Sequence, residues 1–446
     1  MDITPGETKF KAIMKPFPIR RSLFAAAGAL ALFLSVQYSA ALEMRTWLSI
    51  DGRLLEAELV RVVGDKVELR KKDGAVVQVP KSALSFGDLD YVAENAPADK
   101  TKAALGSSTG PKPKLPNPAK DVKIDKTQFK KEAGDFKINS RTYRVFETPH
   151  FKIMYMKPTD PGDLAELGER LWLDTAFFHS TFIPKWSERK MAVILVNDQE
   201  AYEDVGSWFA DMLASSGNKE GAARVRATFP KSASSTLYMP PADADAQAVF
   251  AEVRVFRTTD QRRQTVRGVW DPFRTHTLAS SLLDVQAGNV TGASPEGSFA
   301  IFTGHAFYKE IQLTGRSETN LIGVQGSGND VGSAGGFKDA KDWAPELKKL
   351  IRKEPEMWGP EKNIKEIWSM KSADGANTRN IVFTYAFSRF LQSAPERLSA
   401  YNRLCEKIDV SNQVPTLDEI GKLYGYESEA LFIKAWVAWM DSSDFR

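Results

Sequence analysis

The sequence is poor in the residues that form disulfides and zinc sites. Its 446 residues contain one cysteine, Cys405, and four histidines. A single cysteine excludes an intramolecular disulfide and any zinc site made of cysteine thiolates. Cys405 falls in a stretch expected to be helical, with no histidine near it in sequence, so we interpret it as a small buried apolar residue. The fold must therefore be held together by its apolar core, without disulfides.

An excess of charge of one sign is also missing. Lys and Arg together number 60 and Asp and Glu 57, which gives a formal charge of +3. Proteins that bind nucleic acid usually carry a basic face or stripe, so the composition predicts no nucleic-acid partner. The content of 42% hydrophobic and 11% aromatic residues is typical of a folded protein, and the length indicates two or three domains.

The longest apolar run, residues 22–36, is shorter than the roughly 20 strongly apolar residues of a membrane span. Two arginines precede it, and the small residues Ser39 and Ala41 follow it, which is the pattern of a signal peptide. We predict a signal peptide over residues 1–41, with Met14 as a possible start and no integral membrane span in the mature chain. The expected location is outside the cytoplasm, either periplasmic or extracellular. A retained anchor and the twin-arginine route of export stay open.

Residues 43–95 alternate apolar and polar side chains in short runs separated by turns that contain Asp and Gly. This pattern is typical of antiparallel strands, and strands this short indicate a small barrel. Alternation places every second side chain on the same face of a strand. The expected strands cover residues 45–50, 55–63, 66–71 and 75–79, a short helix covers 85–92, and the side chains expected inside are Trp47, Leu59, Val67, Leu69 and Val79.

Short motifs in this region match a known module. They are Arg45-Thr46-Trp47, Asp51-Gly52, Ala57-Glu58-Leu59-Val60, Lys66-Val67-Glu68-Leu69 and Val79-Pro80. In these motifs the region resembles the SLA-homology type of SH3-like barrel. The resemblance implies a module that binds a protein or peptide and carries no chemistry of its own.

Residues 96–139 are rich in Ala, Lys, Pro, Gly and Ser, and residues 111–118 read Pro-Lys-Pro-Lys-Leu-Pro-Asn-Pro. This composition favours extended polyproline conformations and offers little apolar surface to offset the entropy of ordering. We predict a disordered linker at 96–139, between the barrel at 43–95 and a large domain at 141–446.

The large domain begins with expected strands and continues with helices. Strands followed by helices indicate an α+β domain. The chain is thus expected to be α+β, with a small all-β SH3-like barrel followed by a larger α+β domain whose C-terminal half is helical. A glycine-rich stretch at 323–336 is expected to be a loop between helices. The expected strands are 143–156, 190–196 and 235–239, and the first helices are 163–182 and 198–212.

The order of parts in this domain resembles that of the peptidase-MA-like gluzincins. The matching pieces are the strand with Thr148-Pro149-His150-Phe151, the strand 193–196, and the helices 275–286 and 299–310. The resemblance implies a zincin-like fold. In that family the first of these helices carries H-E-x-x-H, and the second supplies a Glu as the third zinc ligand.

The zinc-binding motif itself is missing. H-E-x-x-H places two imidazoles four positions apart on one helix face, with a general base beside the first. The closest histidines are 29 positions apart, as His276 and His305 are, so no register can supply the motif. The preferred register places degenerate residues at the four functional positions of the family: Ala279, Ser280, Leu283 and Thr303.

Four losses together predict an abandoned catalytic site, with no catalytic residue, no metal and no cofactor. The two helices are still expected to pack together, burying Ala279, Leu282 and Leu283. A substitute site near His276 and His305 is the alternative, with Asp284 or Glu310 as a further ligand. His305 and Glu310, however, lie about 140° apart around a helix, and His276 and Asp284 about 80° apart, so neither pair converges well.

The expected function is therefore that of an exported, non-catalytic, two-module binding protein with a pseudo-metallopeptidase domain. Its expected partner is an unidentified protein or peptide. Enzymatic activity is not expected, but an active hydrolase or metallopeptidase with an atypical site near His276 and His305 stays open. A structural role in the cell envelope is a second alternative.

Overall fold

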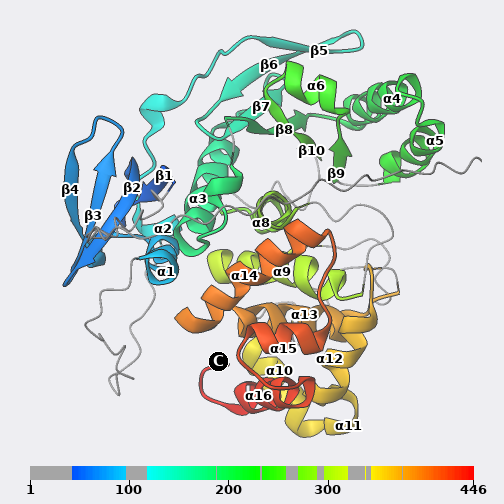
Figure 1. The fold of residues 1–446 in the computed structure, drawn as a ribbon. Helices are drawn as coiled ribbons and strands as arrows, with labels where there is room; N and C mark the ends of the chain where they lie inside the picture. Colours follow the sequence, from blue (N-terminus) through cyan, green and yellow to red (C-terminus); the bar gives the residue numbers. More distant parts are fainter. Residues whose placement is uncertain are drawn as a thin grey trace, which may run out of the picture. The chain divides into compact units, whose positions relative to one another are not determined.

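The computed structural model describes residues 43–96, 118–186, 188–231, 234–257, 270–288, 296–319, 337, 343–373 and 375–446. Two β-sheets and a series of helices make up these residues (Figure 1). The predicted signal peptide at 1–41, residues 97–117 of the predicted linker and the glycine-rich stretch at 323–336 lie outside them.

A small antiparallel sheet begins the described chain. Its strands pair in the order of the sequence, and a short helix, α1 (Phe86–Asn95), follows them. Gly52 and Gly74, both with a φ of 84°, occupy two of the turns between strands, where a positive φ suits glycine. The strands are β1 (Arg45–Leu48), β2 (Leu54–Val63), β3 (Lys66–Lys71) and β4 (Val76–Pro80).

This sheet has an apolar core of its own. Trp47, Leu59, Val67 and Leu69 are buried in it, as the alternation of the sequence predicts, and the half-buried Val79 packs against them. The indole N–H of Trp47 donates to the carbonyl oxygen of Ala57 (2.9 Å). Trp47 is therefore a core residue of the sheet.

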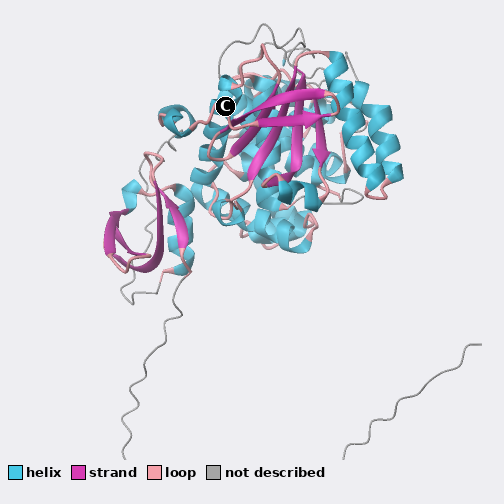
Figure 2. Cartoon of the chain, turned by 90° about the horizontal axis from the view of Figure 1, so that it is seen from above, coloured by secondary structure: helices cyan, strands magenta, loops and turns pink. Residues whose placement is uncertain are grey.

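The second sheet has six strands in the order β5-β6-β7-β8-β10-β9. β7 pairs with β8 and β8 with β10 in parallel, and the other pairs are antiparallel. Figure 2 shows its strands lying side by side among helices. The strands are β5 (Asp135–Ile138), β6 (Arg141–Glu147), β7 (Phe151–Tyr155), β8 (Lys190–Val196), β9 (Ser234–Tyr238) and β10 (Val249–Arg257).

Regular structure begins inside the segment predicted to be a linker, because helix α2 (Pro118–Asp121) and strand β5 both lie within residues 96–139. Ile138 is buried, and the ring of Phe136 lies edge-on to that of Trp208, 5.9 Å away. These two apolar side chains, two positions apart on a strand, anchor the segment to the sheet and to helix α4 (Gln199–Ser215).

Helices cover both faces of the six-stranded sheet, which explains why β8 is almost wholly apolar. Met191 and Val193 pack on the side of α3 (Gly162–Phe178), together with Leu171 of that helix. Ala192 and Ile194 pack on the opposite side, in a separate cluster that contains residues of α4. β8 is therefore buried from two directions.

The C-terminal half consists of helices around their own apolar core. An α+β architecture with a small N-terminal antiparallel sheet and a helical C-terminal half is thus confirmed. None of the helices in the described ranges is long and apolar enough to cross a membrane. The remaining helices are α2 (Pro118–Asp121), α5 (Lys219–Thr228), α6 (Pro241–Ala246), α8 (Pro272–Ala287), α9 (Gly304–Thr314), α10 (Ala344–Lys353), α11 (Pro355–Trp358), α12 (Pro360–Ser369), α13 (Thr378–Leu391), α14 (Pro395–Ser411), α15 (Leu417–Leu423) and α16 (Glu429–Asp441).

Candidate functional site

Helices α8 and α9 pack against each other and carry the residues that the sequence singles out, apart from Thr303, which ends a short π-helix (Phe299–Thr303) directly before α9. α8 begins after Asp271, whose side chain accepts a hydrogen bond from the Arg274 N–H (2.8 Å). Ala279, Leu282 and Leu283 are all buried, which confirms the predicted packing. Leu282 packs in the apolar cluster that contains residues of α3 and β8, whereas Leu283 packs in the core of the C-terminal helices, so α8 is buried on two sides.

α9 also lies close to α13, at Gly304. A Cβ atom added at Gly304 would lie 2.4 Å from the carbonyl oxygen of Thr384, closer than a real Cβ approaches such an atom. Only glycine permits this approach of the two backbones. Gly304 therefore sets the position of α9, and with it the positions of the histidine and glutamate that α9 carries.

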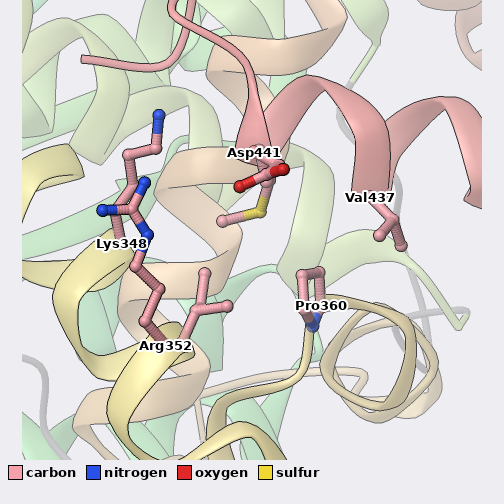
Figure 3. Close-up of a pocket in the computed structure, with 7 residues that line it drawn as sticks. Lys348, Arg352, Pro360, Val437 and Asp441 are labelled. Carbon is pink, nitrogen blue, oxygen red and sulfur yellow. The ribbon is translucent and has the colours of Figure 1, made fainter.

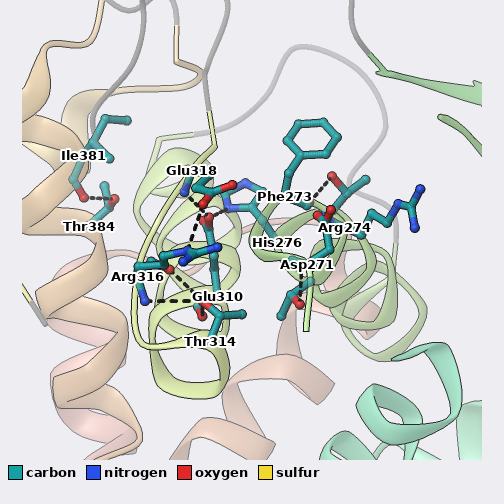
Figure 4. A network of polar contacts seen from close by, with 12 residues as sticks. Asp271, Phe273, Arg274, His276, Glu310, Thr314, Arg316, Glu318, Ile381 and Thr384 are labelled. Atoms are coloured by element: carbon teal, nitrogen blue, oxygen red, sulfur yellow. Dashed lines mark hydrogen bonds and ion pairs between the residues drawn. The ribbon is translucent and has the colours of Figure 1, made fainter. Parts of the chain in front are cut away.

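One imidazole and one carboxylate meet between α8 and α9 (Figure 4). Nδ1 of His276 lies 3.1 Å from Oε2 of Glu310. Glu310 is fully buried, and its other oxygen, Oε1, accepts a hydrogen bond from the Glu318 N–H (2.8 Å). The ring of Phe307 stands edge-on to the imidazole at 4.5 Å. Both oxygens of the buried carboxylate are thus satisfied, and Glu310 fixes the orientation of His276.

The chain just after α9 is tied to the same carboxylate (Figure 4). Arg316 forms an ion pair with Glu318 (2.8 Å), the residue whose N–H reaches Glu310. The hydroxyl of Thr314 lies within hydrogen-bond distance of the backbone carbonyl oxygens of Glu310 (2.8 Å) and Arg316 (2.7 Å), and its single proton can be donated to either. The contact between His276 and Glu310 therefore belongs to an ordered polar network.

His305, the second candidate, has different partners. Its Nδ1 lies 3.1 Å from the hydroxyl of Tyr401 and 3.4 Å from Nε2 of Gln392, and all three side chains are buried. The ring of His179 stands edge-on to His305 at 6.0 Å. Burial, helped by the positive charge of Lys309, lowers the pKa of His179 to about 3 and the pKa of His305 well below its usual value. Both imidazoles are therefore neutral at pH 7.

The two candidate histidines thus contact separate sets of residues, and the poor convergence expected from helical spacing agrees with this. Of the two carboxylates considered with them, Glu310 contacts His276, whereas Asp284 faces β10. The four degenerate positions differ from one another in their exposure to solvent. Ala279 and Leu283 are buried in the core, while Ser280 and Thr303 are partly exposed.

A polar cluster between α8 and β10 was not predicted from the sequence. Nε of Arg254 lies 2.6 Å from Oε1 of Glu252 and 2.6 Å from the hydroxyl of Ser281, and this hydroxyl donates to Glu252 (2.7 Å). Asp284 lies 3.7 Å from Arg254. Burial and the neighbouring Glu252 raise the pKa of Asp284 well above its usual value, although Arg254 opposes this. The available signal was Glu252 and Arg254, two charged residues two positions apart inside the largely apolar segment 249–256.

A further histidine, His150, also has a carboxylate partner. Its Nδ1 lies 2.7 Å from Oε2 of Glu169, and its backbone N–H donates to Oε1 (3.0 Å). The imidazole stacks on Trp172 at 3.6 Å between ring centres. Throughout the described ranges, no group of three or more His, Cys, Asp or Glu side chains is arranged to hold a metal ion.

Comparison with known proteins adds one finding, which concerns the N-terminal part of the chain. Residues 37–99 match the family model described as SLA1 homology domain 1, SHD1. The match includes the whole four-stranded antiparallel sheet and α1. No curated protein and no solved structure matches the chain. The family match and the small antiparallel sheet together fit an SH3-like module, and such a module suggests interaction with other proteins.

Proposed function

We propose that the protein is an exported, non-catalytic binding protein that acts in the periplasm or outside the cell. Its SH3-like module and its large domain each supply a binding surface for a protein or peptide. The large domain is a degenerate, zincin-like relative of the peptidase-MA-like gluzincins. Its sheet-then-helix order and the packing of α8 on α9 support this relationship.

One observation carries the non-catalytic part of this proposal. Between α8 and α9 the imidazole of His276 meets the carboxylate of Glu310, whose other oxygen already accepts from the Glu318 N–H. The second imidazole of the pair, His305, faces Tyr401 and Gln392 instead. A catalytic zinc needs three protein ligands and an adjacent base for its water. The residue four positions after His276 is Ser280, a neutral hydroxyl that is a poor zinc ligand.

The burial of side chains on α8 bears on the register of the lost motif. Two zinc ligands on one helix must lie four positions apart and reach a space that substrate can enter. Ala279 and Leu283 are both buried in the core, which counts against the register that uses them. His276 and the partly exposed Ser280 have the same spacing, and His276 already faces Glu310. In this second register the base would stand at Thr277, which is buried like His276, so the register differs from the first in the exposure of its second ligand position, Ser280.

The two registers can be compared by installing the zinc-binding motif in each of them. Zinc content and thermal stability would be measured for the mature chain and for two variants. One combines Thr277→Glu and Ser280→His, and the other combines Ala279→His, Ser280→Glu, Leu283→His and Thr303→Glu. We expect one-to-one zinc binding only in the first variant and a loss of stability in the second. One-to-one zinc in the unmodified protein, or chelator-sensitive peptidase activity, would refute the non-catalytic proposal.

A specific observation favours a second candidate, a hydrolase that works without the family's zinc motif. A fully buried carboxylate held against Nδ1 of an imidazole fixes the tautomer and leaves Nε2 to act as a general base. Hydrolysis of ester or peptide substrates that His276→Gln abolishes, with unchanged thermal stability, would establish this function. No such activity is expected under the binding proposal.

A further inference from the structure

A pocket lies between α10, α12 and α16, and no residue of α8 or α9 lines it (Figure 3). Its volume is about 210 Å3. An apolar cavity of about 150 Å3 is enough to hold benzene, whereas drug-sized ligands occupy about 300–1,000 Å3. The pocket therefore has room for one aliphatic or aromatic side chain with a short piece of backbone.

Part of the pocket is apolar. Ile351 lines it from α10, Pro360 from the first position of α12, and Val437 and Met440 from α16. Val437 and Met440 are three positions apart and so share the face of α16 that looks towards α10. An apolar side chain placed here would leave water, at a gain of about 25 cal/mol for each Å2 of buried apolar surface.

The rest of the lining is charged, with both signs on facing helices. Lys348 and Arg352 are four positions apart on α10, and Figure 3 shows them on one side of the pocket with Asp441 across from them. Nζ of Lys348 donates to the backbone carbonyl oxygen of Ser442 (2.5 Å). Arg352 is exposed and has no ion-pair partner within the described ranges. Its planar guanidinium suits a carboxylate, which it can bind through two parallel hydrogen bonds.

Asp441 complements this arrangement. It is the last residue of α16, where the unpaired carbonyl groups of the helix end add negative potential, so its own helix does not stabilise it. It forms no ion pair with any described residue, and it is exposed. The pocket thus offers an acceptor for an N–H group on one wall and a cation for a carboxylate on the other.

We propose that this pocket binds the C-terminal residue of a peptide whose last side chain is apolar. The side chain lies against Val437 and Met440, the terminal carboxylate binds Arg352, and the backbone N–H of the same residue donates to Asp441. Because Arg352 and Asp441 are both exposed, the charged end of the pocket is open to solvent, and the preceding residues of the peptide can extend from it. This proposal extends the binding function to a second surface and does not depend on the state of the α8–α9 pair.

The direct test is calorimetric titration of the mature full-length protein with acetyl-Ala-Ala-Leu that has a free carboxylate. The same peptide with a C-terminal amide and free leucine serve as comparisons. We expect the free acid to bind at least about tenfold more tightly than the amide, because the amide loses a charged hydrogen bond. Absence of binding, or equal binding of acid and amide, would overturn the proposal. Free leucine that binds as tightly as the peptide would also overturn the proposal, because the ligand would then be an amino acid and not the end of a peptide.

Substitutions in the pocket test which residues contact the bound peptide. Arg352→Gln should weaken binding of the free acid at least about tenfold, whereas Lys353→Gln, which removes a neighbouring exposed cation that does not line the pocket, should change it less than about twofold. Val437→Trp should fill the pocket and abolish binding. Equal effects of Arg352→Gln and Lys353→Gln would refute the role of Arg352. Because Arg352 is exposed, this comparison holds even if Val437→Trp does not fold.

Discussion

His276 and His305 lie on two packed helices, are both buried, and yet have opposite kinds of partner. His276 faces the carboxylate of Glu310, whereas His305 faces the phenol of Tyr401 and the amide of Gln392. The first arrangement gives an imidazole a carboxylate as its hydrogen-bond partner. The second keeps an imidazole neutral within the core. The role of a histidine in this helix pair therefore depends on the side chain that contacts it, which the sequence alone does not identify.

A single helix separates the two histidine sites. His305 and Glu310 both belong to α9, and five positions place them about 140° apart around its axis. His305 therefore contacts Gln392, directly after α13, and Tyr401 of α14, while Glu310 contacts His276 on α8. Lys309, the other charged residue of α9 besides Glu310, lies on the side of the neutral histidines and forms an ion pair with Asp174 (2.6 Å).

The largest effect is expected from breaking the ion pair between Lys309 and Asp174, which lies on the same side of α9 as the neutral histidines. Lys309 and Asp174 are 3% and 1% exposed. Asp174→Ala would leave a buried ammonium without its counter-charge and should lower the free energy of unfolding by about 3–5 kcal/mol, measured by urea denaturation. The control is Asp211→Ala, which removes an exposed partner of Arg226 and should cost less than about 1 kcal/mol. Equal losses would show that the pair near His305 is not buried in solution.

The second prediction concerns acid. His179 and His305 have pKa values far below the ordinary value of about 6.5. Below pH 6.5 the unfolded chain takes up protons that the folded chain does not, so stability is complete above that pH and falls as the pH drops towards 3. Each histidine should cost about 2 kcal/mol between pH 7 and pH 5.

His305→Gln isolates this contribution. The amide can still bond to Tyr401 and Gln392 but does not titrate, so the variant should lose about 2 kcal/mol less than the unmodified protein between pH 7 and pH 5. Urea denaturation at both pH values measures the difference. An unchanged pH dependence in the variant would mean that His305 is accessible to protons in the folded protein.

A smaller effect is expected from changing the contact between His276 and Glu310. Glu310→Gln keeps the shape of the side chain and an acceptor for the Glu318 N–H, but it replaces a charged hydrogen bond to His276 by a neutral one. The expected loss is about 1 kcal/mol in urea denaturation. If Glu310→Gln costs as much as Asp174→Ala, the two regions do not differ as the structure indicates.

The sequence predicted best those features that depend on local periodicity. Alternation identified Trp47, Leu59, Val67 and Leu69 as core residues, and helical spacing identified the buried face of α8. The strand β5 was missed because two apolar residues, Phe136 and Ile138, are too short a signal within a Lys-rich segment. Their partners lie on α4 and in the sheet, far along the chain.

The candidate site could be predicted only in part. Spacing excluded the zinc motif and indicated that His305 and Glu310 point apart, and the structure agrees. It could not predict that Glu310 meets His276, because that contact depends on the rotation of α9 relative to α8. The cluster of Glu252, Arg254 and Ser281 was missed for the same reason, since a strand residue and a helix residue about 30 positions apart are joined only by tertiary packing.

The smallest effect is expected at Ser280, one turn after His276 on α8. Its neighbour Ser281 provides a matched comparison, because its hydroxyl is fully buried, donates to Glu252 (2.7 Å) and accepts from Arg254 (2.6 Å). Within the described ranges the hydroxyl of Ser280 has no hydrogen-bond partner, and the residue is partly exposed. Ser281→Ala should therefore cost about 1–3 kcal/mol in urea denaturation, since it leaves buried charged groups with an unmade bond, and Ser280→Ala less than about 0.5 kcal/mol. A cost at Ser280 that equals the cost at Ser281 would mean that the hydroxyl has a structural partner. It would then be a poor site at which to rebuild a zinc ligand beside His276.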